Sequence, residues 1–125
     1  MILVDSSVWI DHLRRGDARL AELLSAGQVL PHPFVIGELA MGQLHQRGAI
    51  LGALHGLPRA VTVTDEEVLA MTERERLHGL GIGWVDAHLL AATRLTQGAR
   101  LWTRDRRLAA LATRLGIASA GEGRR

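Results

Sequence analysis

The N-terminal stretch, residues 1–7, constrains the fold of this chain more than any other part of it. A short apolar run, Ile2 to Val4, has the length of a buried strand and ends directly on Asp5. Ser6 and Ser7 follow, and serine is a preferred residue at the start of a helix. Asp5 should therefore lie where a strand is followed by a helix. In an open α/β sheet, ligands bind at this edge, which the carboxyl ends of the strands form.

Composition limits the class of protein. The chain has 125 residues, 47% of them hydrophobic, which is enough for one domain with a single core. It contains no cysteine, so disulfides and thiolate metal sites are excluded. We find no signal-peptide pattern, and no apolar run reaches the roughly 18 residues that would suggest a membrane span. We therefore expect a cytoplasmic protein.

The basic side chains are unevenly distributed. The net charge is only +2, and all 15 basic side chains are arginines because the chain has no lysine. The planar fork of arginine can bind two phosphate oxygens at once. A base-composition bias in the genome nevertheless explains the missing lysine better than function does. The last quarter of the chain holds a cluster that could bind an anionic polymer, made of Arg100, Arg104, Arg106, Arg107, Arg114, Arg124 and Arg125.

Strand-like and helix-like segments alternate along the chain. We expect strands at residues 2–4, 29–30, 60–64, 100–103 and 117–120. We expect helices from Ser6 to Arg15, from Asp17 to Gly27, from Pro33 through Leu44, over 49–57, after a Thr64–Glu67 capping box, from Trp84 to Gly98, and up to Gly116. This order predicts one α/β domain, an α/β/α sandwich over residues 1–120 whose mainly parallel sheet is covered by helices on both faces. Residues 121–125 are expected to be a flexible tail.

Four acidic residues should meet at one edge of this sheet. Asp5 and Asp105 each follow a predicted strand, and Asp86 begins an apolar helix after a glycine-rich loop, residues 79–83. Glu38 is surrounded by apolar sequence, where an ionised carboxylate is costly unless it meets a cation or hydrogen-bond donors. Taken singly, each aspartate could simply cap a helix, and Glu38 could pair with a buried arginine. Their joint arrangement favours a functional site.

The chemistry of this set suits a hard divalent cation. Oxygen ligands without cysteine or a convincing histidine pair favour Mg²⁺ or Mn²⁺ over Zn²⁺. Clustered carboxylates that hold one or two such ions are typical of enzymes that hydrolyse phosphodiester bonds. Because close carboxylates repel one another, we also expect at least one of the four to have a raised pKa without metal.

At these residues the chain resembles a PIN domain, and specifically a VapC-type toxin of bacterial toxin–antitoxin pairs. The resemblance rests on four segments that are in the order and approximate spacing of the family: Val4–Asp11 (VDSSVWID), Val35–Leu39 (VIGEL), Gly83–Ala91 (GWVDAHLLA) and Leu101–Asp105 (LWTRD). It implies a PIN-like fold and an Mg²⁺- or Mn²⁺-dependent endoribonuclease. The implied four-acid site is Asp5, Glu38, Asp86 and Asp105, all as catalytic residues and metal ligands.

The resemblance also implies supporting residues and partners. In the family the acids at Asp5 and Asp86 are the firmest ligands, the one at Glu38 often acts through water, and residues at Ser6 and Thr103 support the site by hydrogen bonding. Such toxins act on RNA, commonly dimerise, and are neutralised by a VapB-like antitoxin. The antitoxin's C-terminal segment wraps the toxin and blocks the site, often with an arginine. The apolar helices of residues 34–57 are our candidates for these contacts, although core packing explains them as well.

Other assignments remain. Arg104 and Arg107 are our candidates for RNA binding. His88 lies close to Asp86 and could touch substrate, whereas we expect Trp9, Trp84 and Trp102 to pack under the site and not to stack on bases. An RNA-processing nuclease without an antitoxin and a non-catalytic RNA-binding relative are the alternative functions.

Two other protein classes also place an aspartate after the first strand. A receiver domain needs a lysine, which this chain lacks. A dehalogenase-like enzyme needs a second aspartate two residues on, where Ser7 stands. Both classes are therefore disfavoured.

Overall fold

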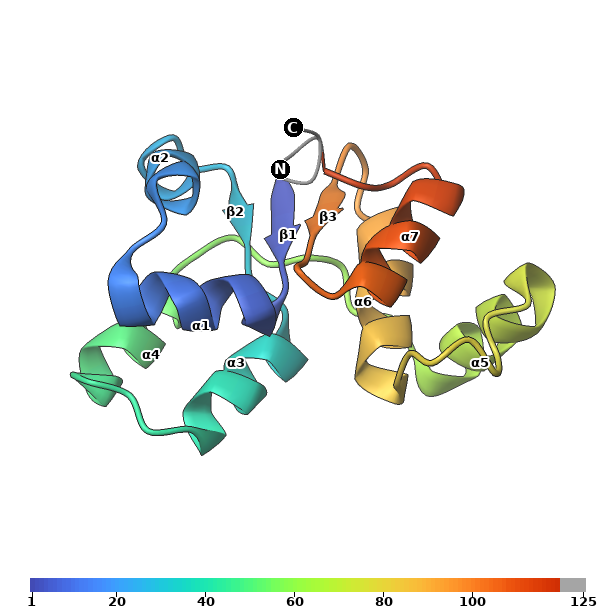
Figure 1. Cartoon of the computed structure of the whole chain (residues 1–125), viewed down its shortest axis with the longest axis horizontal. Helices are drawn as coiled ribbons and strands as arrows, with labels where there is room; N and C mark the ends of the chain where they lie inside the picture. Colours follow the sequence, from blue (N-terminus) through green and yellow to red (C-terminus); the bar gives the residue numbers. More distant parts are fainter. Residues whose placement is uncertain (120–125) are drawn as a thin grey trace.

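A three-stranded parallel sheet forms the centre of the computed structural model, which describes residues 1–119 (Figure 1). Its strands are β1 (Ile2–Val4), β2 (Val29–Leu30) and β3 (Arg100–Trp102), in the order β2–β1–β3. Leu3 of β1 pairs with Leu30 on one side and with Leu101 on the other. The predicted α/β class and parallel sheet are therefore confirmed.

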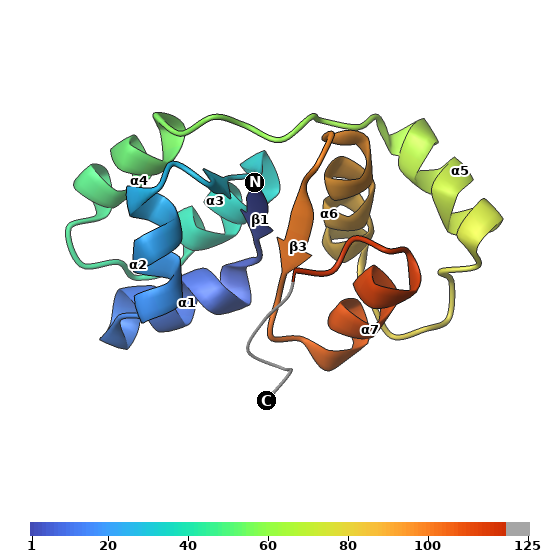
Figure 2. The same cartoon turned by 90° about the horizontal axis from the view of Figure 1, so that it is seen from above.

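Helices cover both faces of this sheet. Their bounds are α1 (Ser6–Arg15), α2 (Ala18–Ser25), α3 (Pro33–Met41), α4 (Arg47–His55), α5 (Asp65–Glu75), α6 (Trp84–Leu95) and α7 (Arg106–Arg114). Seen from above, α1 and α7 lie on one side of the strands, and α3 and α6 lie on the other (Figure 2). No helix in residues 1–119 is long and apolar enough to cross a bilayer.

Burial of apolar side chains from the strands and from α6 stabilises this sheet, although its strands are short. Leu3 and Val4 are completely buried, as expected for a central parallel strand that is covered on both faces. Helix α6 is buried along the whole stretch 87–93, so it is enclosed by neighbours and not merely packed on one side. Apolar burial of this kind contributes about 25 cal/mol for each Å² removed from water.

The predicted strand at residues 60–64 is wrong. This segment is an extended connection between α4 and α5, in which Ala60 and Val63 are buried three residues apart instead of alternating. The Ala60 amide bonds to the Pro31 carbonyl at 3.4 Å and the Val61 amide to the Thr96 hydroxyl at 2.9 Å. The valine and threonine content favours an extended backbone, but no neighbouring strand continues the ladder within the described residues.

Most other predicted boundaries are confirmed within a few residues. The Thr64–Glu67 capping box is present at the start of α5. Helix α3 ends at Met41 and does not reach Leu44, and α4 begins at Arg47, so Gly48 lies inside this helix. The expected last strand pairs with β3 through a parallel bridge between Leu101 and Ala118. Its last residue, the predicted tail and two of the clustered arginines (Ala120, residues 121–125, Arg124 and Arg125) lie outside the described residues.

Candidate active site

Asp5 is the most enclosed of the four acids, with 7% of its surface exposed. The ladder between β1 and β3 continues to it, because the Asp5 amide bonds to the Trp102 carbonyl at 2.9 Å. This pairing brings Thr103 beside it. The Asp5 Oδ2 atom accepts hydrogen bonds from the hydroxyls of Thr103 at 2.7 Å and Ser7 at 2.9 Å, while Oδ1 accepts the Ser6 amide at 2.8 Å. Three donors from two strand ends thus hold one carboxylate in place.

Glu38 stands on an exposed face of α3. Its apolar sequence neighbours suggest a buried acid, but Val35, Ile36 and Leu39 point into the core while Glu38 points out. Its Oε1 atom accepts a hydrogen bond from the Ser6 hydroxyl at 3.1 Å. Within residues 1–119 no arginine pairs with it, so the alternative of a buried ion pair is wrong. Ser6 therefore joins Asp5 and Glu38 through its amide and its hydroxyl.

The other two acids lie at helix starts. Asp86 is the third residue of α6, is half-buried, and accepts the Gly83 amide on Oδ2 at 3.0 Å. Asp105 is the exposed N-cap of α7, and its Oδ1 atom accepts the amides of Arg107 and Leu108 at 2.9 and 3.0 Å. Capping is thus part of the local role of both residues. It leaves the second carboxylate oxygen of each free of these bonds.

The charges of the four acids act on one another. Partial desolvation raises the pKa of Glu38, the Ser6 hydrogen bond opposes this, and the charges of Asp5 and Asp86 raise it further. Desolvation also raises the pKa of Asp86, against the Gly83 hydrogen bond, and the charges of Asp5 and Asp105 add to the rise. The expected raised pKa is therefore confirmed for two of the four acids. All four belong to one electrostatic cluster, and segments far apart in the sequence contribute to it.

The donor chemistry of this cluster fits a hard divalent cation. The four carboxylates repel one another, and within residues 1–119 no arginine pairs with Glu38 or Asp86. A bound positive ion would therefore stabilise their ionised forms. In the part of the chain that the structure describes, however, no three histidine, aspartate or glutamate side chains are placed so as to hold one ion together. Asp5, Asp86, Glu38 and Asp105 are the candidates for ligands of such an ion, and their side chains would have to rearrange to bind it together.

The arginine that we expected to bind RNA at position 104 is engaged within the protein. Arg104 forms ion pairs with Asp11 at α1 and Asp17 at the start of α2, and its guanidinium lies 5.9 Å from the centre of the Trp102 ring. Burial raises the pKa of Asp17, but the Leu20 amide and Arg104 outweigh this and lower it overall. The Arg104 amide also donates to the Ser7 hydroxyl at 3.1 Å. Arg104 therefore fastens the loop after β3 to the first two helices.

Arg107 is placed differently. It is exposed at the start of α7, and its guanidinium covers the backbone of Gly81 in the loop that leads to Asp86. A Cβ atom at Gly81 would come within 2.5 Å of the Arg107 Nη1 atom, and Gly81 also has a φ of +84°. Neither Arg106 nor Arg107 makes a side-chain hydrogen bond or ion pair within the described residues. By contrast, Arg100 and Arg114 bond to backbone carbonyls of Gly116 and Glu75.

A second group of residues beside the acids is aromatic. His88 is 3% exposed, and its Nε2 atom lies 3.0 Å from the Asp65 carboxylate. The rings of Phe34 and Trp84 each lie 4.8 Å from the His88 ring, centre to centre. His88 is therefore buried under these two rings and does not face substrate. Burial, and then the charge of His88, lowers the pKa of nearby His32 to about 4.

Two of the three tryptophans pack as expected. Trp9 and Trp102 are each 3% exposed. Trp84 is 43% exposed, so its expected place in the packing under the site is wrong. As the first residue of α6 it has no helical turn before it to cover its ring.

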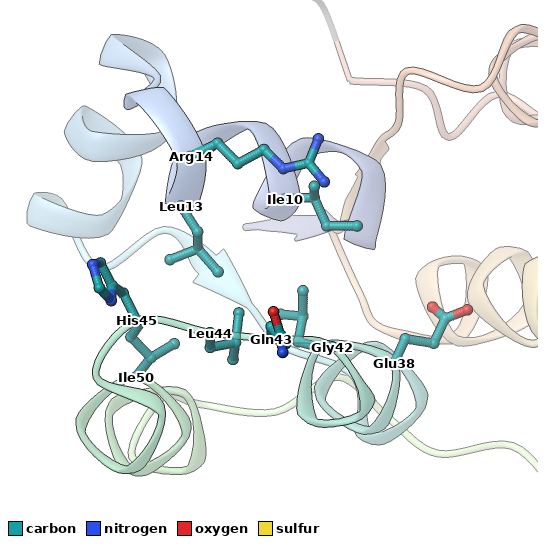
Figure 3. A pocket seen from close by; sticks show the side chains of 10 residues that line it. Ile10, Leu13, Arg14, Glu38, Gly42, Gln43, Leu44, His45 and Ile50 are labelled. Atoms are coloured by element: carbon teal, nitrogen blue, oxygen red, sulfur yellow. The ribbon is translucent and has the colours of Figure 1, made fainter.

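A pocket opens between α1 and the connection from α3 to α4 (Figure 3). Apolar side chains dominate its interior, and the Glu38 carboxylate lies at one end, turned away from them. Its lining residues are Ile10, Leu13, Arg14, Glu38, Leu39, Gly42, Gln43, Leu44, His45 and Ile50. The pocket is thus an apolar groove that ends at the acidic cluster.

Sequence reasoning missed three residues of this region. Ser7 was assigned only to a helix start, and Asp11 and Asp17 were given no site role. The only signal for Ser7 was its place next to Ser6, because the partner hydroxyl of Thr103 is 96 residues away. Asp11 ends the Val4–Asp11 segment and Asp17 begins a predicted helix, but neither position indicated Arg104 as a partner, because it lies 93 and 87 residues further on.

Comparison with known protein families agrees with this fold. The PIN domain model matches residues 2–114, which is most of the chain, and the protein belongs to the PIN domain family.

Curated relatives agree with this assignment. The chain is 52% identical over 122 residues to the proteins named Ribonuclease VapC32 from Mycobacterium tuberculosis strains H37Rv and CDC 1551. The match covers 98% of this chain and 98% of each relative.

Proposed function

We propose that this protein is a metal-dependent endoribonuclease and the toxin of a VapBC-type toxin–antitoxin pair, acting in the cytoplasm. The observation that carries the proposal is the electrostatic cluster of Asp5, Glu38, Asp86 and Asp105, which is drawn from four separate segments. Close similarity to proteins named as ribonucleases over almost the whole chain supports the same activity.

The roles of the four acids follow from how each is held. The carboxylate of Asp5 is held by the most hydrogen bonds, so Asp5 is our best candidate for the central metal ligand. Asp86, whose carboxylate accepts one amide, is our second candidate. Glu38 and Asp105 would add their negative charges to the attraction for the cation. A bound Mg²⁺ or Mn²⁺ would polarise the phosphodiester, lower the pKa of the attacking water and stabilise the leaving oxygen.

Glu38 is our candidate for accepting a proton from the attacking water. Its Oε1 atom is taken by the Ser6 hydroxyl, which leaves Oε2 to accept. Its raised pKa brings it nearer to neutral, where a general base is most effective. Ser6 and Thr103 are positioning residues, since each donates a hydrogen bond to an acid of the site and neither carries a charge.

Arginines at the start of α7 are our candidates for holding the RNA backbone. Arg107 is exposed beside the loop before Asp86, so it could bind a phosphate next to the acids. The contacts of Arg104 with Asp11 and Asp17 make it the weaker of our two original candidates. Neutralising the repulsion between the acids and an incoming phosphate requires such cations.

The apolar groove is our candidate surface for the antitoxin. Its aliphatic lining would hold apolar residues of a partner segment, and the end at Glu38 would receive a basic side chain such as arginine. Such a segment would cover the acidic cluster and block RNA. Leu44→Asp should therefore abolish inhibition by the cognate antitoxin while RNA cleavage persists. Retained inhibition of this variant would exclude the groove as the docking surface.

One assay tests the proposed activity directly. Purified protein is incubated with structured and unstructured RNA, with Mg²⁺, with Mn²⁺ or with a chelator. We expect internal cleavage that needs the divalent ion and disappears in Asp5→Asn. Cleavage without an antitoxin gene beside this one would favour the RNA-processing alternative. RNA binding without cleavage under any ion would establish the non-catalytic alternative.

A further inference from the structure

We propose that Phe34 and Trp84 form a stacking site for an unpaired base of the RNA, next to the acidic cluster. The inference rests on the proposed function, because it names how the same site holds its substrate. Phe34 is 39% exposed and Trp84 is 43% exposed, and both rings sit on the buried ring of His88. Base–aromatic stacking is the usual way in which proteins hold single-stranded nucleic acid without reading one sequence.

The position of each ring relative to the acids supports this assignment. Phe34 and Glu38 are four residues apart on α3, so they share one face of that helix, and both are exposed. Trp84 begins α6 two residues before Asp86. Phe34 is therefore the neighbour of Glu38. Positions two residues apart on a helix do not share a face, so Trp84 is placed here by its contact with the His88 ring, which Phe34 also contacts. A single-stranded RNA with one phosphate at these acids would place an adjacent base within reach of the rings.

The two rings are held by a rigid support. His88 is fixed by burial and by its contact with Asp65, and it meets the Trp84 ring at an interplanar angle of 82° and the Phe34 ring at 60°. The backbone amide of Phe34 is also bonded to the His32 Nδ1 atom at 3.0 Å. Little side-chain entropy remains to be lost when a ligand packs on aromatic rings that are already placed.

Charge distinguishes RNA from an apolar protein segment as the occupant. The Arg107 guanidinium lies against Gly81, three residues before Trp84, so a cation lies on the loop that leads into this ring. A base on the rings with its phosphate near Arg107 uses both features. The acids nearby would repel an acidic protein, and neither Phe34 nor Trp84 lines the apolar groove that ends at Glu38.

Binding of a short single-stranded RNA tests the site without requiring cleavage. The affinity of the Asp5→Asn protein in chelator is measured for an intact oligonucleotide and for one of equal length and charge whose bases are removed. We expect tighter binding of the intact strand, by about tenfold. Trp84→Leu or Phe34→Leu should remove most of this preference, whereas Trp84→Phe should keep most of it. Leu95→Ala, at a similarly exposed apolar residue of α6, is the matched control and should change nothing.

Two results would overturn the proposal. One is that the Asp5→Asn protein, with both rings intact, binds the intact and the base-free oligonucleotide equally well or binds neither. The other is a preference for bases that survives in Trp84→Leu combined with Phe34→Leu when circular dichroism shows the double variant folded. Failure of the proposed nuclease activity would look different, because the wild-type protein would then cleave no RNA while the base-dependent binding remained.

Discussion

The two sides of the acidic cluster are built in different ways. On the side of β1 and β3, Asp5 and Asp105 accept five hydrogen bonds from backbone amides and hydroxyls. The ion pairs of Arg104 connect the loop between β3 and α7 to α1 and to the start of α2. On the side of α3 and α6, Glu38 and Asp86 accept one hydrogen bond each and have raised pKa values. One side is therefore held by hydrogen bonds, and on the other side a positive charge would stabilise the ionised carboxylates.

This difference indicates a division of labour. A preformed ligand fixes where a cation would bind, since its hydrogen bonds leave it a single orientation. Acids that are still repelled by their neighbours gain most when the cation arrives. Substitutions beside Asp5 should therefore lower activity because they change the position of its carboxylate. Substitutions of Glu38 and Asp86 should change how the protein responds to pH and to divalent ions.

Asp5→Asn should give the largest effect. Its loss removes a charge that no neighbour can replace, so RNA cleavage should fall by more than about 100-fold, beyond the 10–100-fold typical of residues that only support a ligand. The measurement is initial rate on a labelled RNA in saturating Mg²⁺. Because asparagine can keep bonds to Ser6, Ser7 and Thr103, melting in chelator should show a protein as stable as wild type or more so. A strongly destabilised variant would show that Asp5 is mainly a structural cap.

Thr103→Val should cost less, about 10–100-fold in cleavage rate, because it frees one oxygen of Asp5 from its shortest hydrogen bond. Thr103→Ser keeps the hydroxyl and is the matched control, with a rate within a few-fold of wild type. The same rate in Thr103→Val and wild type would mean that Asp5 needs no such support.

Arg104→Gln and Arg107→Gln should separate structure from RNA binding. Arg104 is half-buried and forms ion pairs with Asp11 and Asp17, which the substitution removes. The free energy of unfolding, measured with urea, should therefore fall by about 1–3 kcal/mol. Arg107→Gln should leave stability unchanged, weaken RNA binding several-fold and reduce the salt dependence by about one counterion. Reversed outcomes would exchange the roles that we assign to the two residues.

Gly81→Ala should act through Arg107. The substitution forces alanine into a left-handed backbone conformation and displaces the guanidinium, at a cost of about 1–2 kcal/mol in stability. RNA binding should weaken as in Arg107→Gln. The effects of the two substitutions on binding should not add in the double variant. Gly79→Ala is the control for backbone strain alone, because Gly79 also has a positive φ but a Cβ atom there would meet nothing within 4 Å.

The smallest effect concerns stability and pH. The pKa values of Glu38 and Asp86 are raised in the folded protein, so their contribution to stability is fully present below the unfolded values of about 4 and is lost as pH rises through the folded values. In chelator at neutral pH, Glu38→Gln and Asp86→Asn should therefore raise Tm by about 1–3 °C, and at pH 3 they should not. Solvent screens Glu38, which is exposed, so its effect should be the smaller one. A neutral-pH Tm below that of wild type for both variants would show that the two acids do not repel their neighbours.

The local elements were predictable because local chemistry sets them. The apolar run before Asp5, the Thr64–Glu67 capping box and the glycine at position 16 each act within a few residues. The segment 60–64 shows the limit, since its composition favours a strand but pairing depends on a neighbour that the sequence does not reveal. The same limit hid the exposure of Trp84 and of Glu38, which depends on what packs against α6 and α3.

By itself, the sequence determined that strands end on acids and that helices begin there, because propensity and capping act between near neighbours. The order of these elements predicted that the four acids lie near one edge of the sheet, and the family resemblance named them as a site. Only the tertiary structure decided which residues serve them: Thr103 and Ser7 on Asp5, Arg104 on Asp11 and Asp17, and Arg107 on Gly81. Most of these partners lie far apart in the chain, and the β1–β3 pairing and the packing of α6 and α7 beside it bring them together. The physical reason is that hydrogen bonds, ion pairs and repulsion depend on distance in space, which sequence separation does not measure.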